Sequence, residues 1–328
     1  MRNCIRLTIV VMSIACILGI VSVSCAQDKE TTKTEEVYIQ KSTLVEKVKG
    51  GEIDWGNQMF FATGEGVMPS PSQEPNRAKA YLKAKGYARM QAIAHLLMVI
   101  EGTAISYEGY GKDYMAQDET LRQKIEGFVR GVEIQDEQKI AVEGDTIVRV
   151  TVSTKMYGKA NPGTAFLEKV ADSTSTPTVE KPKVQVEIPK ESPKPVEPIV
   201  VKPEAQVGPF TSVIIDTRGF NVSRAMSPKI RREDGSEVWG TIRVTPEFAL
   251  DTGIVSYART MEAARGSSRC GNNPLIIRAI GRAGGKAMCD AVVSDPNATL
   301  ILAESTQTKF LDQCKVIFIV DPPKSLKG

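Results

Sequence analysis

The clearest periodic pattern in the chain is a row of small apolar residues at every fourth position, formed by Ala80, Ala84, Ala88 and Ala92 and continued by Leu96. Residues spaced by four lie on one face of an α-helix, so the row predicts a helix from a cap at Asn76 through about Ile100. Gly102 is suited to end this helix. Because the side chains of the row are small, we expect this face to pack closely against a sheet or another helix.

Short runs of strand-forming residues lie on both sides of this helix. Met59–Thr63 is typical of a strand, and Gly64 and Gly66 predict a turn that ends it. A dinucleotide-binding loop is not indicated, because Pro69 stands where its third glycine belongs. A shorter helix is expected at about 118–125. Three further strands are expected at 132–134, 140–142 and 146–152. The pattern predicts one long helix on an antiparallel sheet, an α+β layer.

A second set of elements follows in the last third of the chain. An Asp234-Gly235 turn predicts a hairpin, and Thr245 and Asp295, each followed by proline, predict two helix starts. Apolar runs predict strands at 212–216, 275–280, 290–293 and 315–320. This region is therefore expected to form a mixed sheet with helices, and the whole chain to be α+β with two small domains.

A proline-rich segment separates the two predicted domains. It carries seven prolines between Asp172 and Val207, interleaved with Lys, Glu and Val. This composition favours extended polyproline II, either as a spacer that holds the domains apart or as a passive joint. The predicted organisation is a signal peptide at 1–25, a polar tether at 26–51, a first domain at 52–171, the linker at 172–207 and a C-terminal domain at 208–322.

The first 25 residues resemble a secretory signal. Arg2 and Arg6 precede an apolar run from Leu7 to Val23, and small residues surround Cys25. Three outcomes stay open: lipidation of Cys25, cleavage after Ala26, or retention of the run as an uncleaved anchor. In each case the body of the protein is exported. A lipidated protein is expected at the periplasmic face of an outer membrane, and otherwise the protein is expected in the periplasm or the medium.

Composition excludes several classes of function. Hydrophobic content of 41% and charged content of 25% are globular values, and the formal charge of +3 offers no general attraction to nucleic acid. The single histidine, His95, lies on the apolar helix and is expected to be a packed residue. No catalytic set, metal site or cofactor motif is indicated, so we expect a protein that is not an enzyme and needs no cofactor.

The body of the chain carries two candidate sites. Cys289 and Cys314 flank apolar strand-like runs and are the pair expected to form a disulfide, with Cys270 left over. Basic residues outnumber acidic ones from Gly208 onward. They suggest either a solvated face or an anion-binding patch made of Arg259, Arg265, Arg269, Arg278, Arg282 and Lys286.

The first domain, from about residue 55 to 157, resembles the twenty-kilodalton (LPP-twenty) bacterial outer-membrane lipoprotein family, which includes FlgP. The residues that carry the resemblance are Trp55, the Phe61–Gly66 turn, the helix Ala78–Ala94 and the run Gly127–Val132. A weaker similarity links the helix to the N-terminal domain of FlgT. The resemblance implies a non-enzymatic envelope lipoprotein, and a role in flagellar assembly is one function that it suggests.

Two functional hypotheses follow. The first is a structural or assembly protein of the bacterial envelope, anchored by lipid at Cys25, with envelope or flagellar-assembly proteins as partners and self-association into a homo-oligomer left open. The alternative is a periplasmic binding module for peptidoglycan or another anionic polymer, which would use the basic residues between Arg259 and Lys286. Neither hypothesis involves nucleic acid.

Overall fold

The computed structural model describes residues 41–42, 44–175, 184–190, 207–240, 244 and 246–322, all of which lie in one compact unit. Helices and strands are mixed, and the predicted α+β class is confirmed. The leader and its Cys25 lie outside the described residues. Of the helices that are described, none is long and apolar enough to cross a membrane.

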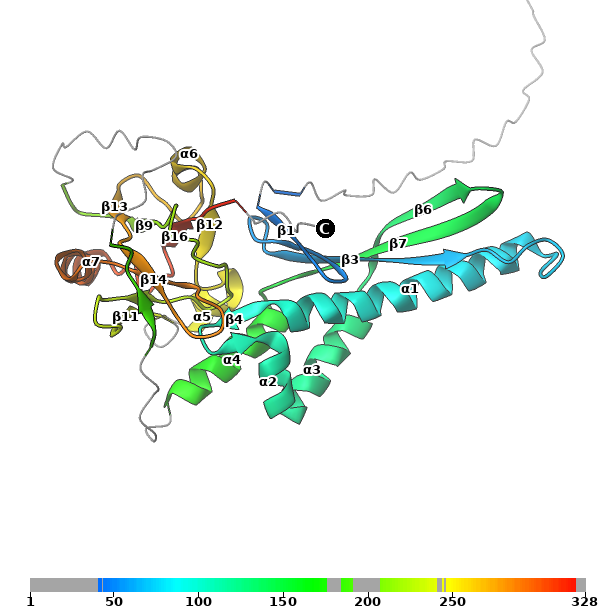
Figure 1. The fold of residues 1–328 in the computed structure, drawn as a ribbon, viewed down its shortest axis with the longest axis horizontal. Helices are drawn as coiled ribbons and strands as arrows, with labels where there is room; N and C mark the ends of the chain where they lie inside the picture. The colour runs from blue at the N-terminus through cyan, green and yellow to red at the C-terminus, as the bar shows by residue number, and fades with distance from the viewer. Residues whose placement is uncertain are drawn as a thin grey trace, which may run out of the picture. The chain divides into compact units, whose positions relative to one another are not determined.

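The long helix predicted from the alanine row is α1 (Arg77–Gly102), and it begins where the sequence indicated. The Asn76 side chain accepts a hydrogen bond from the Lys79 backbone N–H at 3.1 Å, which caps the first turn. All five residues of the row are buried. The helix lies along one face of the first sheet and packs chiefly on β3 and β7, as Figure 1 shows.

The first sheet is antiparallel throughout, in the order β1-β2-β3-β7-β6. Its strands are β1 (Val45–Val48), β2 (Gly51–Asp54), β3 (Met59–Val67), β6 (Ile134–Val142) and β7 (Asp145–Lys155). A small hairpin and three further helices complete this half: β4 (Ala104–Ser106), β5 (Gly109–Tyr110), α2 (Gly111–Gln117), α3 (Glu119–Arg130) and α4 (Pro162–Ser175).

Regular structure begins earlier in the chain than expected, because β1 (Val45–Val48) lies inside the segment 26–51 that was predicted to be a polar tether. β1 pairs with β2 across a two-residue turn at Lys49 and Gly50, and Gly50 has a φ of 94°. Leu44, just before β1, is buried against the first-half core. The Gly50-Gly51 pair was the available signal, since glycine with a positive φ is what a tight hairpin requires.

Gly64 and Gly66 do not form the predicted turn; both lie within β3. A Cβ added at Gly64 would stand 2.1 Å from the Ala88 carbonyl oxygen, and one at Gly66 would stand 2.1 Å from that of Ala84. The glycines are therefore required by the close approach of the strand to the alanine face of α1. Glycine occurs at these two positions because of helix–strand packing and not because the chain reverses direction there.

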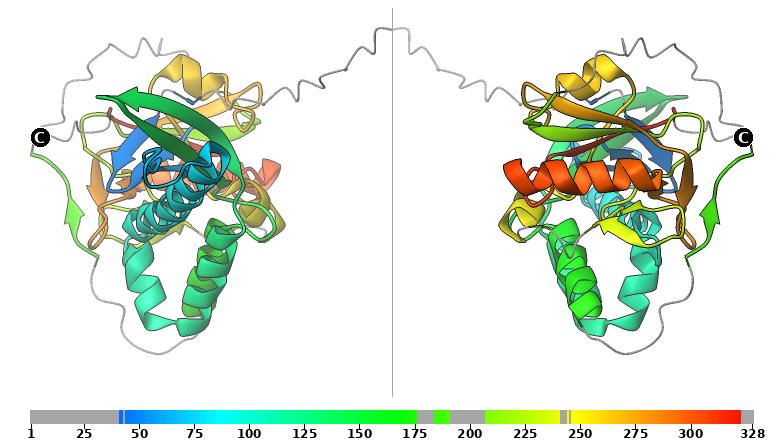
Figure 2. Two further views of the ribbon diagram at one scale, coloured as in Figure 1. Left: turned by 90° about the vertical axis from the view of Figure 1, so that its right-hand side faces the viewer. Right: turned by 90° about the vertical axis from the view of Figure 1, so that its left-hand side faces the viewer.

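The second half contains two sheets. A parallel sheet has the order β12-β16-β9-β13, with β9 (Ser212–Asp216), β12 (Ser256–Ala258), β13 (Pro274–Arg278) and β16 (Val316–Ile319). A mixed sheet has the order β11-β10-β15-β14-β8, with β8 (Val186–Glu187), β10 (Ile230–Arg231), β11 (Glu237–Trp239), β14 (Gly281–Ala283) and β15 (Asp290–Val292). The helices are α5 (Pro246–Thr252), α6 (Met261–Arg265) and α7 (Asp295–Thr308), and Figure 2 shows α7 alongside these strands.

The described part of the predicted linker differs from an extended spacer. Residues 184–190 include β8, which pairs antiparallel with Arg282 and Ala283 of β14. Helix α4 also runs to Ser175, beyond the expected end of the first domain at 171. Valines alternate with polar residues at 184–187, so this stretch can add a strand to an open sheet edge in spite of the prolines around it.

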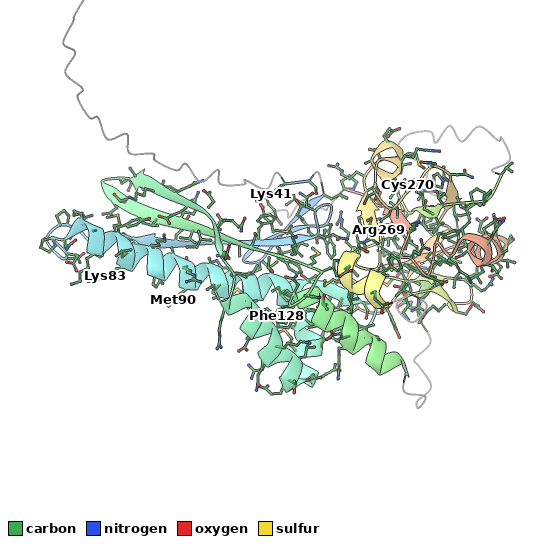
Figure 3. All side chains as sticks on the ribbon, turned by 180° about the vertical axis from the view of Figure 1, so that it is seen from behind. Lys41, Lys83, Met90, Phe128, Arg269 and Cys270 are labelled. Atoms are coloured by element: carbon green, nitrogen blue, oxygen red, sulfur yellow. The ribbon has the colours of Figure 1, made fainter. Side chains whose placement is uncertain are left out.

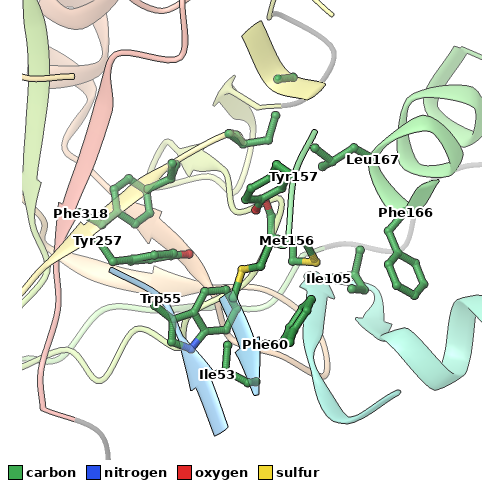
Figure 4. Close-up of a cluster of buried hydrophobic side chains, with 14 of the residues drawn as sticks. Ile53, Trp55, Phe60, Ile105, Met156, Tyr157, Phe166, Leu167, Tyr257 and Phe318 are labelled. Carbon is green, nitrogen blue, oxygen red and sulfur yellow. The ribbon is translucent and has the colours of Figure 1, made fainter. Parts of the chain in front are cut away.

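The two halves share one hydrophobic core instead of being held apart. The rings of Trp55 and Tyr257 meet edge to face with centroids 5.6 Å apart, and Tyr257 meets Phe318 in the same way at 6.2 Å. The Tyr157 hydroxyl donates to the Met226 carbonyl at 3.2 Å. Figure 4 shows these side chains converging from both halves. Burial of large aromatic groups makes this junction a major contribution to stability.

Candidate functional site

A pocket of about 320 Å³ lies where the first half meets the second. One side is formed by β1, β2, Trp55 and the β4–β5 hairpin, and the other by residues 221–224, Arg282 and the end of the described chain at 321–322. Its apolar lining comes from Ile53, Trp55, Ala104, Tyr110, Val222 and Pro322, and its charged lining from Glu46, Lys47, Arg224, Arg282 and Asp321.

Arg224 is a charged residue of the pocket lining, with 8% of its side chain exposed. Its Nη2 donates to the Asp321 carbonyl at 2.9 Å, and its Nη1 donates to Glu46 Oε2 at 3.4 Å. Its Nε–H is buried and has no hydrogen-bond partner among the described residues. Glu46 also accepts from the Trp55 indole N–H at 2.8 Å. The guanidinium therefore ties the two halves together while keeping one unused donor.

The other charged groups of the pocket are engaged to different degrees. Arg282 donates from Nε to Glu187 at 2.8 Å and from Nη1 to the Asn221 carbonyl at 3.1 Å. The Asp321 carboxylate accepts from the backbone N–H groups of Gly219 and Asn221. Lys47 is exposed at the rim. A lining of apolar side chains and guanidinium groups suits a small ligand with an apolar body and an anionic group.

Two buried carboxylates outside the pocket are neutralised internally. Asp216 accepts two bonds from Arg218, at 2.9 and 3.0 Å, and Arg278 Nη1 lies 3.2 Å from the same carboxylate. The Arg278 guanidinium also stands over the Phe220 ring at 5.0 Å. Since removal of one member would leave a buried charge unpaired, this cluster is a structural feature of the second half.

The second buried carboxylate is Asp290. It accepts from Arg231 Nε at 2.6 Å and from the Lys229 backbone N–H at 3.0 Å. Burial raises the pKa of the Asp290 carboxyl, and the Arg231 guanidinium opposes that shift. The Tyr107 ring, from the first half, covers the Arg231 guanidinium at 4.8 Å and the Lys229 ammonium at 5.4 Å. The cluster joins the halves on a second side.

Five of the six basic residues predicted as an anion-binding patch lie in different surroundings in the fold. Arg269 is turned inward and donates to the backbone carbonyls of Gly253, Ile254 and Cys314. Arg278 belongs to the Asp216 cluster and Arg282 to the pocket, while Lys286 pairs with Asp113 at 3.2 Å. Arg265 is exposed on α6. The reason lies in the tertiary structure, because basic residues that are close in sequence contact different elements once the chain between them is folded.

The expected disulfide is absent, because Cys289 and Cys314 are separate, buried thiols. Cys289 lies in a small cluster with Ala104, Ala225 and Ala287, whereas Cys314 belongs to the main core. Burial raises the pKa of the Cys314 thiol to about 11 and that of the Cys289 thiol well above its usual range. Both behave as small apolar side chains.

The single histidine stands where its environment accounts for it. His95 is half-buried on α1, and its Nδ1 lies 2.6 Å from the Thr63 carbonyl of β3. No group of three or more His, Cys, Asp or Glu residues that could hold a metal ion occurs in the described part of the chain.

Sequence reasoning missed the pocket and its arginine. Glu46 and Arg224 are 178 positions apart, and no local pattern marks either as special. Trp55 carries the clearest local signal, because a tryptophan can bury a large area between packed elements while its indole N–H finds a hydrogen-bond partner.

Comparison with known proteins supports a likeness for the second half. The family model described as Treponema pallidum Tp0624, second domain, matches residues 212–322. The matched segment begins with β9 and ends just after β16, so it contains the whole parallel sheet. It covers less than half of the chain. No curated protein matches the chain.

Proposed function

We propose that the protein is a non-enzymatic component of the bacterial envelope, exported and anchored to the outer membrane through a lipid on Cys25, with a structural or assembly role. Flagellar assembly is one setting for this role, on the basis of the resemblance of the first half to FlgP-like lipoproteins. Export rests on the leader, in which two arginines and an apolar run precede Cys25.

The observation that carries the structural role is the commitment of buried charged groups to internal bonds. Asp216 is held by Arg218 and Arg278, and Asp290 is held by Arg231. Such groups are the ones that catalysis would need free and aimed at a cleft. Here they hold sheets and halves together, as suits a rigid part of an assembly.

Anchoring is tested by metabolic labelling with palmitate. The wild-type chain is expected to incorporate label and to be processed in a globomycin-sensitive way, whereas Cys25→Ala should lose both properties. Cys16→Ala, in the same leader, is the matched control and should keep them. An unmodified Gln27 at the N-terminus of the mature chain would contradict the anchor while leaving export intact.

A second candidate function is binding of peptidoglycan or another anionic polymer by the second half. The pocket favours it, since Lys47, Arg224 and Arg282 all line it together with apolar side chains. In co-sedimentation with purified sacculi at low salt, the wild-type chain should be retained and Arg282→Gln should be retained less. Lys309→Gln, on an exposed site beyond α7, is the control. No retention of the wild type would remove this candidate.

A further inference from the structure

The pocket between the halves lies at one particular edge of the parallel sheet. β16 and β9 are the two central strands of that sheet, and their carboxyl ends lie side by side, with Ile319 paired to Asp216. The pocket is lined by residues 221–224, which follow β9, and by residues 321–322, which follow β16. In open parallel sheets, ligands bind outside the carboxyl ends of the strands. The topology therefore marks this pocket as a binding site independently of its charges.

Both carboxylates of the pocket lining are engaged by donors of the chain itself. The Asp321 carboxylate accepts from two backbone N–H groups of the loop after β9, at 2.8 and 3.0 Å. Glu46 accepts from Arg224 and from the indole N–H of Trp55. The acidic groups thus hold the walls of the pocket in place, and their charge is already matched by internal donors.

Other polar groups of the lining are used less completely. The Arg224 side chain is almost fully buried, and its Nε–H has no acceptor among the described residues. Within that same part of the chain, the side chains of Lys47, Asn221 and Ser223 form no hydrogen bond or ion pair. Buried donors in folded proteins nearly always have an acceptor. What these cationic and neutral groups lack is therefore an anionic acceptor from outside the chain.

The net charge of the lining limits the charge of such an acceptor. Three basic residues (Lys47, Arg224 and Arg282) and two acidic ones (Glu46 and Asp321) line the pocket, which gives a formal charge of +1. A charge of this size is balanced by one carboxylate, whereas a phosphate dianion or a run of charged groups would leave negative charge uncompensated.

The rest of the lining is apolar and lies deeper than the polar groups. Ile53, Trp55, Ala104 and Val222 are all buried. Asn221 and Ser223, by contrast, are exposed. The volume of about 320 Å³ is at the low end of the range for ligand pockets, so the occupant is a small molecule.

We propose that this pocket binds a small organic monocarboxylate, with its apolar body against Trp55 and Val222 and its carboxylate held by Arg224 and Lys47. A carboxylate suits a guanidinium because the hydrogen bonds between them are charge-assisted. The inference deepens the second candidate function, since it rests on the same pocket. It narrows the ligand to a molecule, or the end of one, that carries a single carboxylate, in place of the repeated charge of a polymer.

The two tryptophans of the chain supply a site-specific readout. The Trp55 indole N–H donates to Glu46, which lines the pocket. The Trp239 indole N–H donates to the Leu311 carbonyl, and neither of these residues lines the pocket. The two indole signals of a nitrogen–proton correlation spectrum are assigned with Trp239→Phe. Titration with 3-phenylpropanoate should move the Trp55 signal to saturation and leave the Trp239 signal in place.

Two further probes separate the contributions of charge and apolar surface. 3-Phenylpropanamide has nearly the same shape as 3-phenylpropanoate but no charge, and inorganic phosphate has charge but no apolar body. Each should bind at least about tenfold more weakly than 3-phenylpropanoate. Equal binding of the acid and the amide would overturn the proposal. So would a Trp55 signal that does not move with 3-phenylpropanoate at about 10 mM.

Gly102 allows the pocket to be filled without a change to its charged groups. It lines the pocket at the end of α1, and a Cβ added there meets no heavy atom within 4 Å. Gly102→Phe should therefore keep the thermal midpoint of the wild type and bind 3-phenylpropanoate at least about tenfold more weakly. A folded Gly102→Phe that binds as the wild type does would overturn the proposal.

Gly86→Phe is the matched control. Gly86 lies in the same helix, an added Cβ there also meets no atom within 4 Å, and the residue does not line the pocket. Figure 3 shows Lys83 and Met90, which lie on either side of Gly86 in the sequence, on this part of α1. Gly86 is about 24 Å from Gly102 along the helix. Binding of 3-phenylpropanoate by Gly86→Phe should equal that of the wild type.

Co-sedimentation with sacculi separates this inference from polymer binding. If 3-phenylpropanoate binds and sacculi do not retain the chain, the inference stands and the polymer candidate is removed. Retention on sacculi without movement of the Trp55 signal would overturn the inference and leave the polymer candidate in place. Neither outcome depends on the lipid anchor or on the role in the envelope.

Discussion

Gly64 of β3 lies against Ala88 of α1 so closely that a Cβ on Gly64 would stand 2.1 Å from the Ala88 carbonyl oxygen and 2.4 Å from the Ala92 nitrogen. Both obstacles are backbone atoms, which cannot move aside as a flexible side chain can. The contact shows why a small residue recurs on both surfaces: glycine on the strand and alanine on the helix let the two layers approach within backbone contact.

The first prediction concerns that contact. Gly64→Ala should destabilise the chain by about 1–3 kcal/mol or more, because the layers must separate to admit one methyl group. The measurement is the free energy of unfolding in urea. Gly86→Ala is the control, since no atom lies within 4 Å of an added Cβ there and alanine favours a helix by roughly 0.5–1 kcal/mol. Equal effects of the two changes would refute the packing.

The alanine row allows a second comparison. Ala88→Leu should lower the thermal midpoint, because Ala88 is fully buried between α1 and the sheet and overpacking typically costs about 1–3 kcal/mol. Ala78→Leu introduces the same side chain at an exposed position in the first turn of the same helix. It should be nearly neutral. A stabilising Ala88→Leu would mean that the row does not face the sheet.

The shared core predicts cooperative unfolding of both halves. Trp55 reports on the first half and Trp239 on the second, and both are buried. Trp239→Phe and Trp55→Phe each leave one tryptophan. For each variant, unfolding in guanidinium chloride is followed by tryptophan fluorescence and by far-ultraviolet circular dichroism, and the two transitions should coincide. Two separate transitions within one variant would show that the junction at Trp55 and Tyr257 is too weak to couple the halves.

Acid should weaken the chain partly through Asp118, the cap of α3. Its pKa is lowered, first by the Lys169 ammonium at 2.8 Å and then by the Leu121 backbone N–H. A lowered folded-state pKa means that the stabilisation is present above the unfolded value of about 3.9 and is lost as pH falls through the folded value.

Asp118→Asn keeps a capping oxygen for Leu121 but removes the charge. The variant should therefore be less stable than the wild type near neutral pH, and the difference in urea midpoint should shrink as the pH is lowered below about 4. Asp145→Asn, at an exposed strand end, serves as the control. If the difference in urea midpoint between Asp118→Asn and the wild type did not change with pH, the ion pair with Lys169 would be contradicted.

The buried thiols supply a chemical prediction. In a chain with Cys4→Ser, Cys16→Ser and Cys25→Ser, a thiol-reactive chromogenic disulfide at pH 8 should modify Cys270, Cys289 and Cys314 only after unfolding. Burial excludes the reagent, and the pKa of about 11 at Cys314 keeps that thiol protonated. Fewer than three reactive thiols in the unfolded, unreduced chain would reveal the disulfide that the structure lacks.

Local signals were sufficient wherever structure depends on near neighbours. The fourfold alanine period and the Asn76 cap predicted α1, and the Asp234-Gly235 turn predicted the β10–β11 hairpin. Periodicity and capping act within a few residues, so a sequence displays them directly. The same reasoning identified the apolar runs that became β9, β15 and β16, and with them the α+β class.

Other features depend on elements that meet only in the folded chain. The sequence around Gly64 predicts a turn, because the residue that requires the glycine, Ala88, lies 24 positions away. The bond between Glu46 and Arg224, which line the pocket, joins residues 178 positions apart in the sequence. Residues of the predicted linker became β8 because β14 offered an open edge. Local composition determined which helices and strands this protein can form; long-range packing and the pairing of buried charges decided where they meet.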